Sequence, residues 1–347
     1  MIDFIISGQG LAGSMLAKEL IREGASIKII DPLPEVSSSI VAAGILHPIT
    51  GRRIVKTWMA DQLIPFAISE YDKIDTAVFN KTPLLEIFTS TQQRNEWMNR
   101  SAESSISSWI GETVKEVNVN GVHLPYGAIE IKNTGWLDVK LLTELARNSF
   151  SEKNIFINDV VSESDISYEN GIVKWKNISA GRIIFCNGFR AATESMFSYL
   201  PFVPAKGEIL EIHCPELTTD FILSKGIYII PAGNDYFKVG STFNWEDLKE
   251  EPSEEGRLQL VTALEKLISL PFKIINQYAA VRPANKDRRP FIGFHPQNSL
   301  AGIFNGLGTK GAMLAPWFAR HFTKHLIYNE PLMPEVNIER YKKLLQE

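Results

Sequence analysis

The pattern of apolar and polar residues divides the start of the chain into a strand, a turn and a helix. An apolar run over residues 2–6 ends at Ser7, and apolar residues then recur at helical spacing over residues 11–23. A second apolar run, over residues 26–30, ends in Asp31. This order predicts a strand, a helix and a second strand of a parallel sheet.

The remainder of the chain alternates between helical and strand spacing. Alternating strands over residues 207–242 indicate a separate antiparallel layer, so a second domain interrupts the first. The residues after Pro334 form a short polar helix in this interpretation. Helices are predicted over residues 61–74, 91–108, 139–149, 253–270 and 312–328, and strands over residues 84–90, 121–124, 127–131, 154–161, 171–175, 182–186, 207–213, 227–230, 237–242 and 300–304.

Composition narrows the class of protein. A chain of 347 residues, 44% of them hydrophobic, is long enough for two domains with their own cores. A net charge of -4 gives no general attraction to nucleic acid. Two cysteines without a C-x-x-C spacing, together with the absence of a signal sequence or of a long apolar segment, favour a cytoplasmic protein with no integral membrane segment.

The first turn carries the spacing Gly8-x-Gly10-x-x-Gly13, directly between the first strand and the first helix. Glycines permit the turn, let a pyrophosphate approach the backbone and let helix pack on strand, while the helix N-terminus offers N–H groups to phosphate. Asp31 is then placed to accept hydrogen bonds from ribose hydroxyls and argues against a 2′-phosphate. The pattern predicts dinucleotide binding rather than a merely tight junction, without separating FAD from NAD.

A second glycine-rich turn, over residues 306–311, also leads into a helix. The strand over residues 182–186 ends in Asn187-Gly188, which is either an ordinary turn or a ligand contact at the carboxyl edge of the sheet. The two histidines His321 and His325 have no glutamate between them and no evident third ligand, so we expect no metal site.

Seven motifs in a fixed order give the chain a resemblance that runs nearly from end to end. It resembles the D-amino acid oxidase (DAO) family of FAD-dependent oxidoreductases, which includes glycine oxidase, sarcosine oxidase and D-amino acid dehydrogenase. The motifs are Gly8-x-Gly10-x-x-Gly13, Ala42-Ala43-Gly44-Ile45-Leu46-x-Pro48, Gly135-Trp136-x-Asp138, Pro204-x-Lys206-Gly207, Tyr228-Ile229-Ile230-Pro231, Arg282-Pro283 through Asp287, Pro290 and Gly293, and Gly306-x-Gly308-x-x-Gly311-x-x-x-Ala315-Pro316.

The resemblance implies an α/β fold with two domains. One is an FAD-binding, Rossmann-like domain of the GR2 type with a parallel sheet, expected over residues 1–75, 136–204 and 276–347. The other is a mainly antiparallel α+β substrate domain over residues 76–135 and 205–275.

The same resemblance implies residues that hold FAD, non-covalently, because Ala280 stands where monomeric sarcosine oxidase has its flavin-linked cysteine. The start of the helix after residue 311 would stabilise negative charge on the reduced flavin. Lys310 would add to this effect, or would simply be solvated. The implied FAD-binding residues are Gly8, Gly10, Leu11, Ala12, Gly13, Asp31, Ala43, Gly44, Val160, Val161, Gly188, Gly306, Leu307, Gly308, Thr309, Lys310 and Gly311.

Three residues are implied at the substrate. Arg282 corresponds to the arginine that binds the substrate carboxylate, the alternative being a structural ion pair with Asp287. Tyr228 stands at the position of a substrate-contacting tyrosine, the alternative being packing on a strand. His47 departs from the family pattern and is either a substrate or flavin contact or a loop histidine without a role.

The expected activity is oxidation of the C–N bond of a small amino acid or secondary amine. Hydride would pass to flavin N5, the resulting imine would be hydrolysed, and oxygen or an electron-transfer partner would reoxidise the flavin. Two alternatives remain open: a flavoprotein like the oxidase half of the enzyme that modifies the tRNA wobble uridine, and a non-catalytic protein that keeps FAD as a relic.

Overall fold

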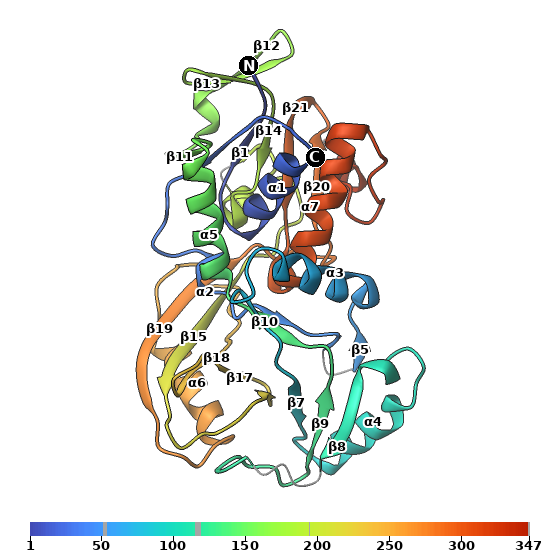
Figure 1. The fold of residues 1–347 in the computed structure, drawn as a ribbon, viewed down its shortest axis with the longest axis vertical. Helices are drawn as coiled ribbons and strands as arrows, with labels where there is room; N and C mark the ends of the chain where they lie inside the picture. Colours follow the sequence, from blue (N-terminus) through green and yellow to red (C-terminus); the bar gives the residue numbers. More distant parts are fainter. Residues whose placement is uncertain (51–53, 115–118, 194, 346–347) are drawn as a thin grey trace. The chain divides into compact units, whose positions relative to one another are not determined.

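The protein divides into two compact units, each built from segments far apart in the sequence (Figure 1). In this computed structural model, residues 1–50, 54–114, 119–193 and 195–345 are described. Unit 1 comprises Met1–Ala42, Val139–Ala205 and Val281–Glu347, and unit 2 comprises Ala43–Asp138 and Lys206–Ala280. The first boundary therefore lies at Ala42 and not at residue 75, because the strand that follows Gly44 pairs within unit 2.

Five parallel strands form the centre of unit 1. Parallel pairing places them in the order β11 (Phe156–Asn158), β2 (Ile27–Asp31), β1 (Ile2–Ser7), β14 (Ile178–Phe185) and β21 (Asn298–Asn305). All five carboxyl ends therefore lie at one edge of the sheet. Antiparallel strands complete the sheet: β12 (Ile166–Glu169), β13 (Ile172–Trp175) and β20 (Phe291–His295).

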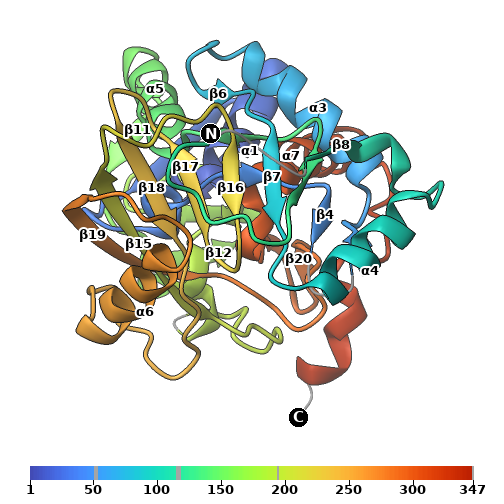
Figure 2. The ribbon, with the colours of Figure 1, turned by 90° about the horizontal axis from the view of Figure 1, so that it is seen from below.

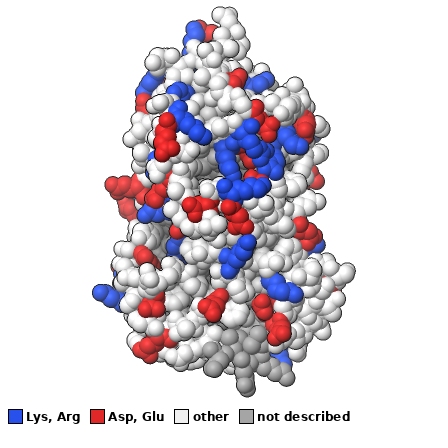
Figure 3. All heavy atoms as spheres, in the orientation of Figure 1, with Lys and Arg blue, Asp and Glu red and all other residues white. Residues whose placement is uncertain are grey.

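Three long helices pack with this sheet: α1 (Leu11–Arg22), α5 (Val139–Glu152) and α7 (Gly311–Tyr328). The α1 helix packs against both α5 and α7. On the α1 and α7 side, Figure 3 shows a gathering of Lys and Arg side chains, which the net charge of the whole chain does not reveal. The shorter helical segments of unit 1 are α2 (Ser38–Val41), η2 (Glu163–Asp165), η3 (Gly188–Ala192), η4 (Gly308–Lys310) and η5 (Ile338–Leu345).

An eight-stranded, mainly antiparallel sheet forms unit 2, and Figure 2 shows its middle strands side by side. One face packs on the helix α6 (Glu254–Glu265), burying residues such as Leu210, Leu223 and Leu264. The strand order is β19 (Lys273–Arg282), β15 (Ala205–His213), β18 (Tyr236–Gly240), β17 (Tyr228–Pro231), β16 (Ile222–Ser224), β7 (Leu84–Ile87), β9 (Ala128–Ile131) and β8 (Ile110–Val114).

A smaller three-stranded sheet in unit 2 joins β3 (Ile45–Leu46), β10 (Gly135–Leu137) and β6 (Phe79–Asn80). This sheet explains why the chain from Ala43 onwards belongs to unit 2. The remaining elements of the unit are β4 (Ile49–Thr50), β5 (Val55–Lys56), α3 (Ala60–Asp72), α4 (Thr91–Ser101) and η1 (Ser107–Trp109).

The predicted strand over residues 121–124 is wrong. Gly121 has a φ of 70°, which breaks an extended chain, and Val122 makes only an isolated bridge to Ile268. The sequence pattern also missed β8, β12 and β16, short strands whose pairing depends on neighbours distant in sequence. Among the described residues, no helix is both long enough and apolar enough to span a membrane.

Candidate active site

The turn between β1 and α1 requires glycine at two positions. Gly8 has a φ of 104°, and a Cβ added there would lie 2.6 Å from the carbonyl oxygen of Cys186. A Cβ added to Gly13 would lie 1.9 Å from the carbonyl oxygen of Gly8. The α1 helix therefore packs directly on the turn, which brings its first N–H groups to the carboxyl edge of the sheet.

The N-terminus of α1 keeps donors for a ligand. The N–H of Leu11 donates to Ser39 Oγ at 3.0 Å, and that of Ser14 donates to the carbonyl of Gly10 at 2.9 Å. Within the described part of the chain, the N–H groups of Ala12 and Gly13 donate to no protein acceptor. Two unpaired donors at a helix start suit the phosphate oxygens of a dinucleotide such as FAD.

Asp31, at the end of β2, is held by two backbone donors. The N–H of Gln9, inside the glycine turn, donates to Oδ2 at 2.7 Å, and the N–H of Leu33 donates to Oδ1 at 2.8 Å. These bonds tie the carboxylate to the turn while leaving it lone pairs for further donors. This arrangement suits the predicted contact with a ribose.

The ends of β14 and β21 meet at the same edge. Asn305 Nδ2 donates to the carbonyl of Gly188 at 2.8 Å, and Asn305 Oδ1 accepts from the N–H of Gly306 at 2.8 Å. Gly188 has a φ of 60°, and a Cβ added there would meet nothing within 4 Å. The edge of the sheet therefore has open space beside its backbone at Gly188.

Val160 and Val161 follow β11, the outermost parallel strand. The side chain of Val160 is 58% exposed, and its N–H donates to Asp159 Oδ1 at 2.8 Å. Val161 packs against the core of unit 1. Because the N–H of Val160 is already used, Val161 has the better N–H for the predicted adenine contact.

The residues from 306 to 311 connect β21 to α7 and are tied to the segment after β19. The N–H of Gly308 donates to the carbonyl of Pro283 at 3.2 Å. Pro283, the acceptor of this bond, directly follows Arg282 in the sequence. Arg282 and the loop over residues 306–311 both belong to unit 1. Burial lowers the pKa of Arg282 to about 10, so its guanidinium remains charged at neutral pH.

The carboxylate of Asp287 is already used by other residues. Its Oδ2 accepts from Arg340 Nε at 3.1 Å and from the Tyr341 hydroxyl at 2.7 Å, and its Oδ1 accepts from the N–H of Arg289 at 2.9 Å. Asp287 therefore has structural partners in Arg289, Arg340 and Tyr341.

Lys310 is half-buried at the start of α7. Burial, together with the nearby charges of Arg288 and Arg289, lowers its pKa to about 8. The environment of Lys310 therefore differs from that of a solvated surface lysine.

Both histidines on α7 have backbone partners. His321 Nε2 accepts a hydrogen bond from the N–H of Met333 at 3.0 Å, and His325 Nδ1 lies 2.7 Å from the carbonyl oxygen of Glu330.

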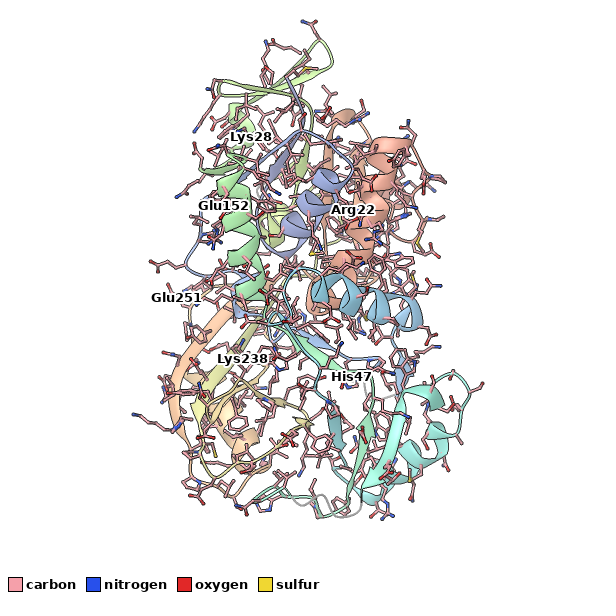
Figure 4. All side chains as sticks on the ribbon, in the orientation of Figure 1. Arg22, Lys28, His47, Glu152, Lys238 and Glu251 are labelled. Carbon is pink, nitrogen blue, oxygen red and sulfur yellow. The ribbon has the colours of Figure 1, made fainter. Side chains whose placement is uncertain are left out.

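Four of the predicted residues, Ala43, Gly44, His47 and Tyr228, belong to unit 2. Gly44 has a φ of 69°, and its carbonyl accepts from the N–H of Leu137 at 3.0 Å, so it holds β3 against β10. His47 is 8% exposed, and its Nδ1 accepts from the N–H of Ile49 at 3.2 Å. Figure 4 labels His47 within this unit.

His47 and Tyr228 lie edge to face, with ring centroids 6.4 Å apart. Burial and the charge of Glu86 raise the pKa of Tyr228 well above its usual value, so its hydroxyl is a hydrogen-bond donor. Glu86 was not among the predicted site residues. A single glutamate in a short strand has no sequence signal that separates it from a solvent-facing residue.

Three comparisons place the chain among known proteins. A family model described as DAO, FAD dependent oxidoreductase, matches residues 3–325. The tRNA 5-methylaminomethyl-2-thiouridine biosynthesis bifunctional protein of Legionella pneumophila (strain Corby) is 21% identical over 311 residues, covering 83% of this chain and 45% of the relative. Glycine oxidase of Bacillus subtilis (strain 168) is 32% identical over 120 residues, covering 33% of this chain and 32% of that enzyme.

Among solved structures, iminodiacetate oxidase from Chelativorans sp. BNC1 has the same fold. Its TM-score is 0.80 at 21% identity, covering 97% of this chain and 98% of that chain. The chain spans less than half the length of the two curated relatives described above, at 45% and 32%. The family match, in contrast, extends over most of the sequence. The chain belongs to the DAO family of FAD-dependent oxidoreductases.

Proposed function

We propose that this FAD-dependent oxidoreductase oxidises the C–N bond of a small amino acid or secondary amine. The substrate loses a hydride from carbon and a proton from nitrogen, and water hydrolyses the C=N bond that forms. The names of the similar proteins, glycine oxidase and iminodiacetate oxidase, support an amine that carries a carboxylate. Oxygen and an electron-transfer protein are the two classes of final acceptor, which a measurement of oxygen uptake separates.

One observation carries the proposal: the backbone bond between Gly308 and Pro283. It joins the loop before α7, which in this family faces the cofactor, to the segment that begins with Arg282. The backbone next to Arg282 is thereby held close to a helix start in unit 1, and we propose that its charged guanidinium faces the substrate. Such a group binds a carboxylate through two parallel hydrogen bonds and fixes the neighbouring carbon.

We propose that FAD is held by groups at the carboxyl edge of the sheet in unit 1. These are the unpaired N–H groups of Ala12 and Gly13, the carboxylate of Asp31 and the open backbone at Gly188. Bound there, FAD supplies the hydride acceptor. The N-terminus of α7 favours negative charge beside it through the helix dipole. Since Ala280 is not a cysteine, we propose that the cofactor is held non-covalently.

In unit 2, we propose that Tyr228 donates a hydrogen bond to the substrate. Its raised pKa keeps the hydroxyl protonated throughout the physiological range. We assign His47 to the support of the Tyr228 ring, because the two rings lie edge to face and His47 Nδ1 is held by the backbone.

The test is an anaerobic titration of the purified holoenzyme with glycine, sarcosine, D-amino acids, proline and iminodiacetate. We expect one of them to bleach the flavin spectrum. In an Arg282→Ala variant that still binds FAD, kcat/KM for that substrate should fall by about 100-fold, because a buried carboxylate loses its charged partner. The exposed Arg190→Ala is the matched control and should behave as wild type.

Two outcomes would contradict this proposal. Full activity in Arg282→Ala would remove the carboxylate anchor. A flavin that no amine reduces would favour one of two alternatives, a non-catalytic relic or an enzyme with a nucleic-acid substrate. The tRNA-modifying relative and the Lys and Arg side chains over α1 and α7 are the observations behind the nucleic-acid alternative. Binding of tRNA that weakens steeply with salt would support the nucleic-acid alternative over the relic.

A further inference from the structure

A row of polar side chains crosses three neighbouring strands of unit 2. Ser224 on β16 pairs with Glu86 on β7 and with Tyr228 on β17. Residues directly opposite in a sheet point to the same face, so these three side chains lie together on one face.

The other face of the same strands is apolar. The intervening residues Leu85, Leu223 and Ile229 belong to the core that α6 covers. The polar row is therefore not part of the packing between sheet and helix. A glutamate on the remaining face of a central strand needs a different explanation.

Glu86 lacks a charged partner in the described part of the chain. Ser224 donates one hydrogen bond to its carboxylate, which has about four acceptor sites. The described salt bridges include none to Glu86. Lys238, labelled in Figure 4, lies on the same face of the sheet, but its ammonium contacts an aromatic ring. It lies 5.0 Å from the centre of the Trp136 ring.

The surroundings of Glu86 favour a cation over another carboxylate or a neutral group. Burial raises the pKa of Glu86 to about 7, and its charge in turn raises the pKa of Tyr228. The ring of Tyr228 lies on the same face of the sheet as Glu86, and the ring of His47 lies edge to face with it. A half-buried carboxylate with an incomplete set of donors, beside aromatic rings, suits a small ammonium group.

We infer that Glu86, Ser224 and Tyr228 form a recognition site for the protonated amine of a ligand. The ammonium donates to the free acceptor sites of the Glu86 carboxylate, and Tyr228 and His47 border it. This inference rests on the proposed function for the identity of the ligand as the amine substrate, and it names Glu86 as the residue that selects amines over neutral isosteres.

The test compares ligands that differ only in the amine. Isothermal titration of the holoenzyme under anaerobic conditions would use sarcosine and methoxyacetate, and glycine and glycolate. We expect Glu86→Gln to weaken the binding of sarcosine or glycine by about ten- to hundred-fold, and to leave methoxyacetate and glycolate unchanged. Arg282→Ala should weaken both members of each pair.

Glu130→Gln is the matched control, because Glu130 on β9 pairs with Leu85 and so points to the opposite face. Ser224→Ala is a second variant that retains the carboxylate and should weaken amine binding less than Glu86→Gln. A thermal unfolding curve for each variant checks that it is folded.

The inference would be overturned if the wild-type protein bound no amine of the panel, or if Glu86→Gln affected amines and their isosteres equally. Its failure differs from that of the proposed function. Amine binding that depends on Glu86 without flavin bleaching would contradict only the oxidation, whereas bleaching with unchanged amine affinity in Glu86→Gln would contradict only the role of Glu86.

Discussion

At the scale of single residues, Asp31 and Glu86 show how surroundings divide the roles of two carboxylates. Asp31, at the end of β2, accepts hydrogen bonds from two backbone N–H groups. Glu86 lies on a sheet face with one hydroxyl donor and no described cation. The first carboxylate is ready to accept from neutral hydroxyls, whereas the second gains most from a cation.

The raised pKa of Glu86 predicts a pH dependence of stability. The folded pKa is about 7 and the reference value is 4.5, so between them the folded state holds a proton that the unfolded state has released. The stability of wild type relative to a Glu86 that stays charged is therefore highest below the reference pKa. This stability is lost as the pH rises through the folded pKa, because Glu86 then ionises in the folded state too. From about pH 5 to about pH 8, the wild type should lose about 1–3 kcal/mol relative to Glu86→Gln.

Urea unfolding midpoints of the two ligand-free proteins across this range would measure the difference. Subtraction of the variant removes every other group that titrates in both proteins. Parallel curves for wild type and Glu86→Gln would show that Glu86 ionises as it does in the unfolded chain.

At the scale of elements, a buried ion pair fixes α1 against α7. Glu19 on α1 is 0% exposed, and its Oε2 lies 2.5 Å from Arg22 Nη2 and 3.1 Å from Arg320 Nε on α7. The α1 N-terminus carries the free N–H groups, and α7 starts at the second glycine loop. The packing of these two helices therefore positions both turns of the site.

Arg320→Ala should destabilise unit 1 by about 1–3 kcal/mol, because Glu19 stays buried with one fewer charged partner. Arg257→Ala, an exposed arginine on α6, is the control and should change the free energy of unfolding by less than about 0.5 kcal/mol. Denaturant unfolding measures both. Equal effects of the two substitutions would mean that the Glu19 pair adds nothing to helix packing.

At the scale of the whole molecule, unit 1 is built from three segments and unit 2 from two. Strands β1, β14 and β21 come from all three segments of unit 1, yet they pair side by side. A ligand along their carboxyl ends contacts every segment at once. Binding of that ligand is therefore coupled to the folding of the complete unit.

Removal of FAD should lower the unfolding temperature of the protein. Added back at about 100 times its Kd, FAD should stabilise the folded state by about 2.7 kcal/mol, since it binds only that state. Riboflavin, which lacks the pyrophosphate and adenosine, is the control and should stabilise much less. An apoprotein whose unfolding temperature is unchanged by FAD would contradict the site at this edge.

Local pattern was sufficient for much of the fold and for the cofactor turns. The spacing of Gly8, Gly10 and Gly13 is a contiguous signal, because the strand, the turn and the helix follow one another directly in the sequence. The same holds for residues 306–311 before α7. The resemblance carried by ordered motifs then indicated the family, which the comparison confirmed.

Only the tertiary structure decided which distant residues meet. Strand β16 exists because β7 and β17 flank it, and the polar row with Glu86 follows from that pairing. The boundary at Ala42 follows from pairing of β3 with β10. The sequence by itself determined the turns, the long helices and the family, whose signals are local or ordered along the chain. The register of short strands, the unit boundaries and the surroundings of Glu86 depend on long-range pairing, which no local pattern contains.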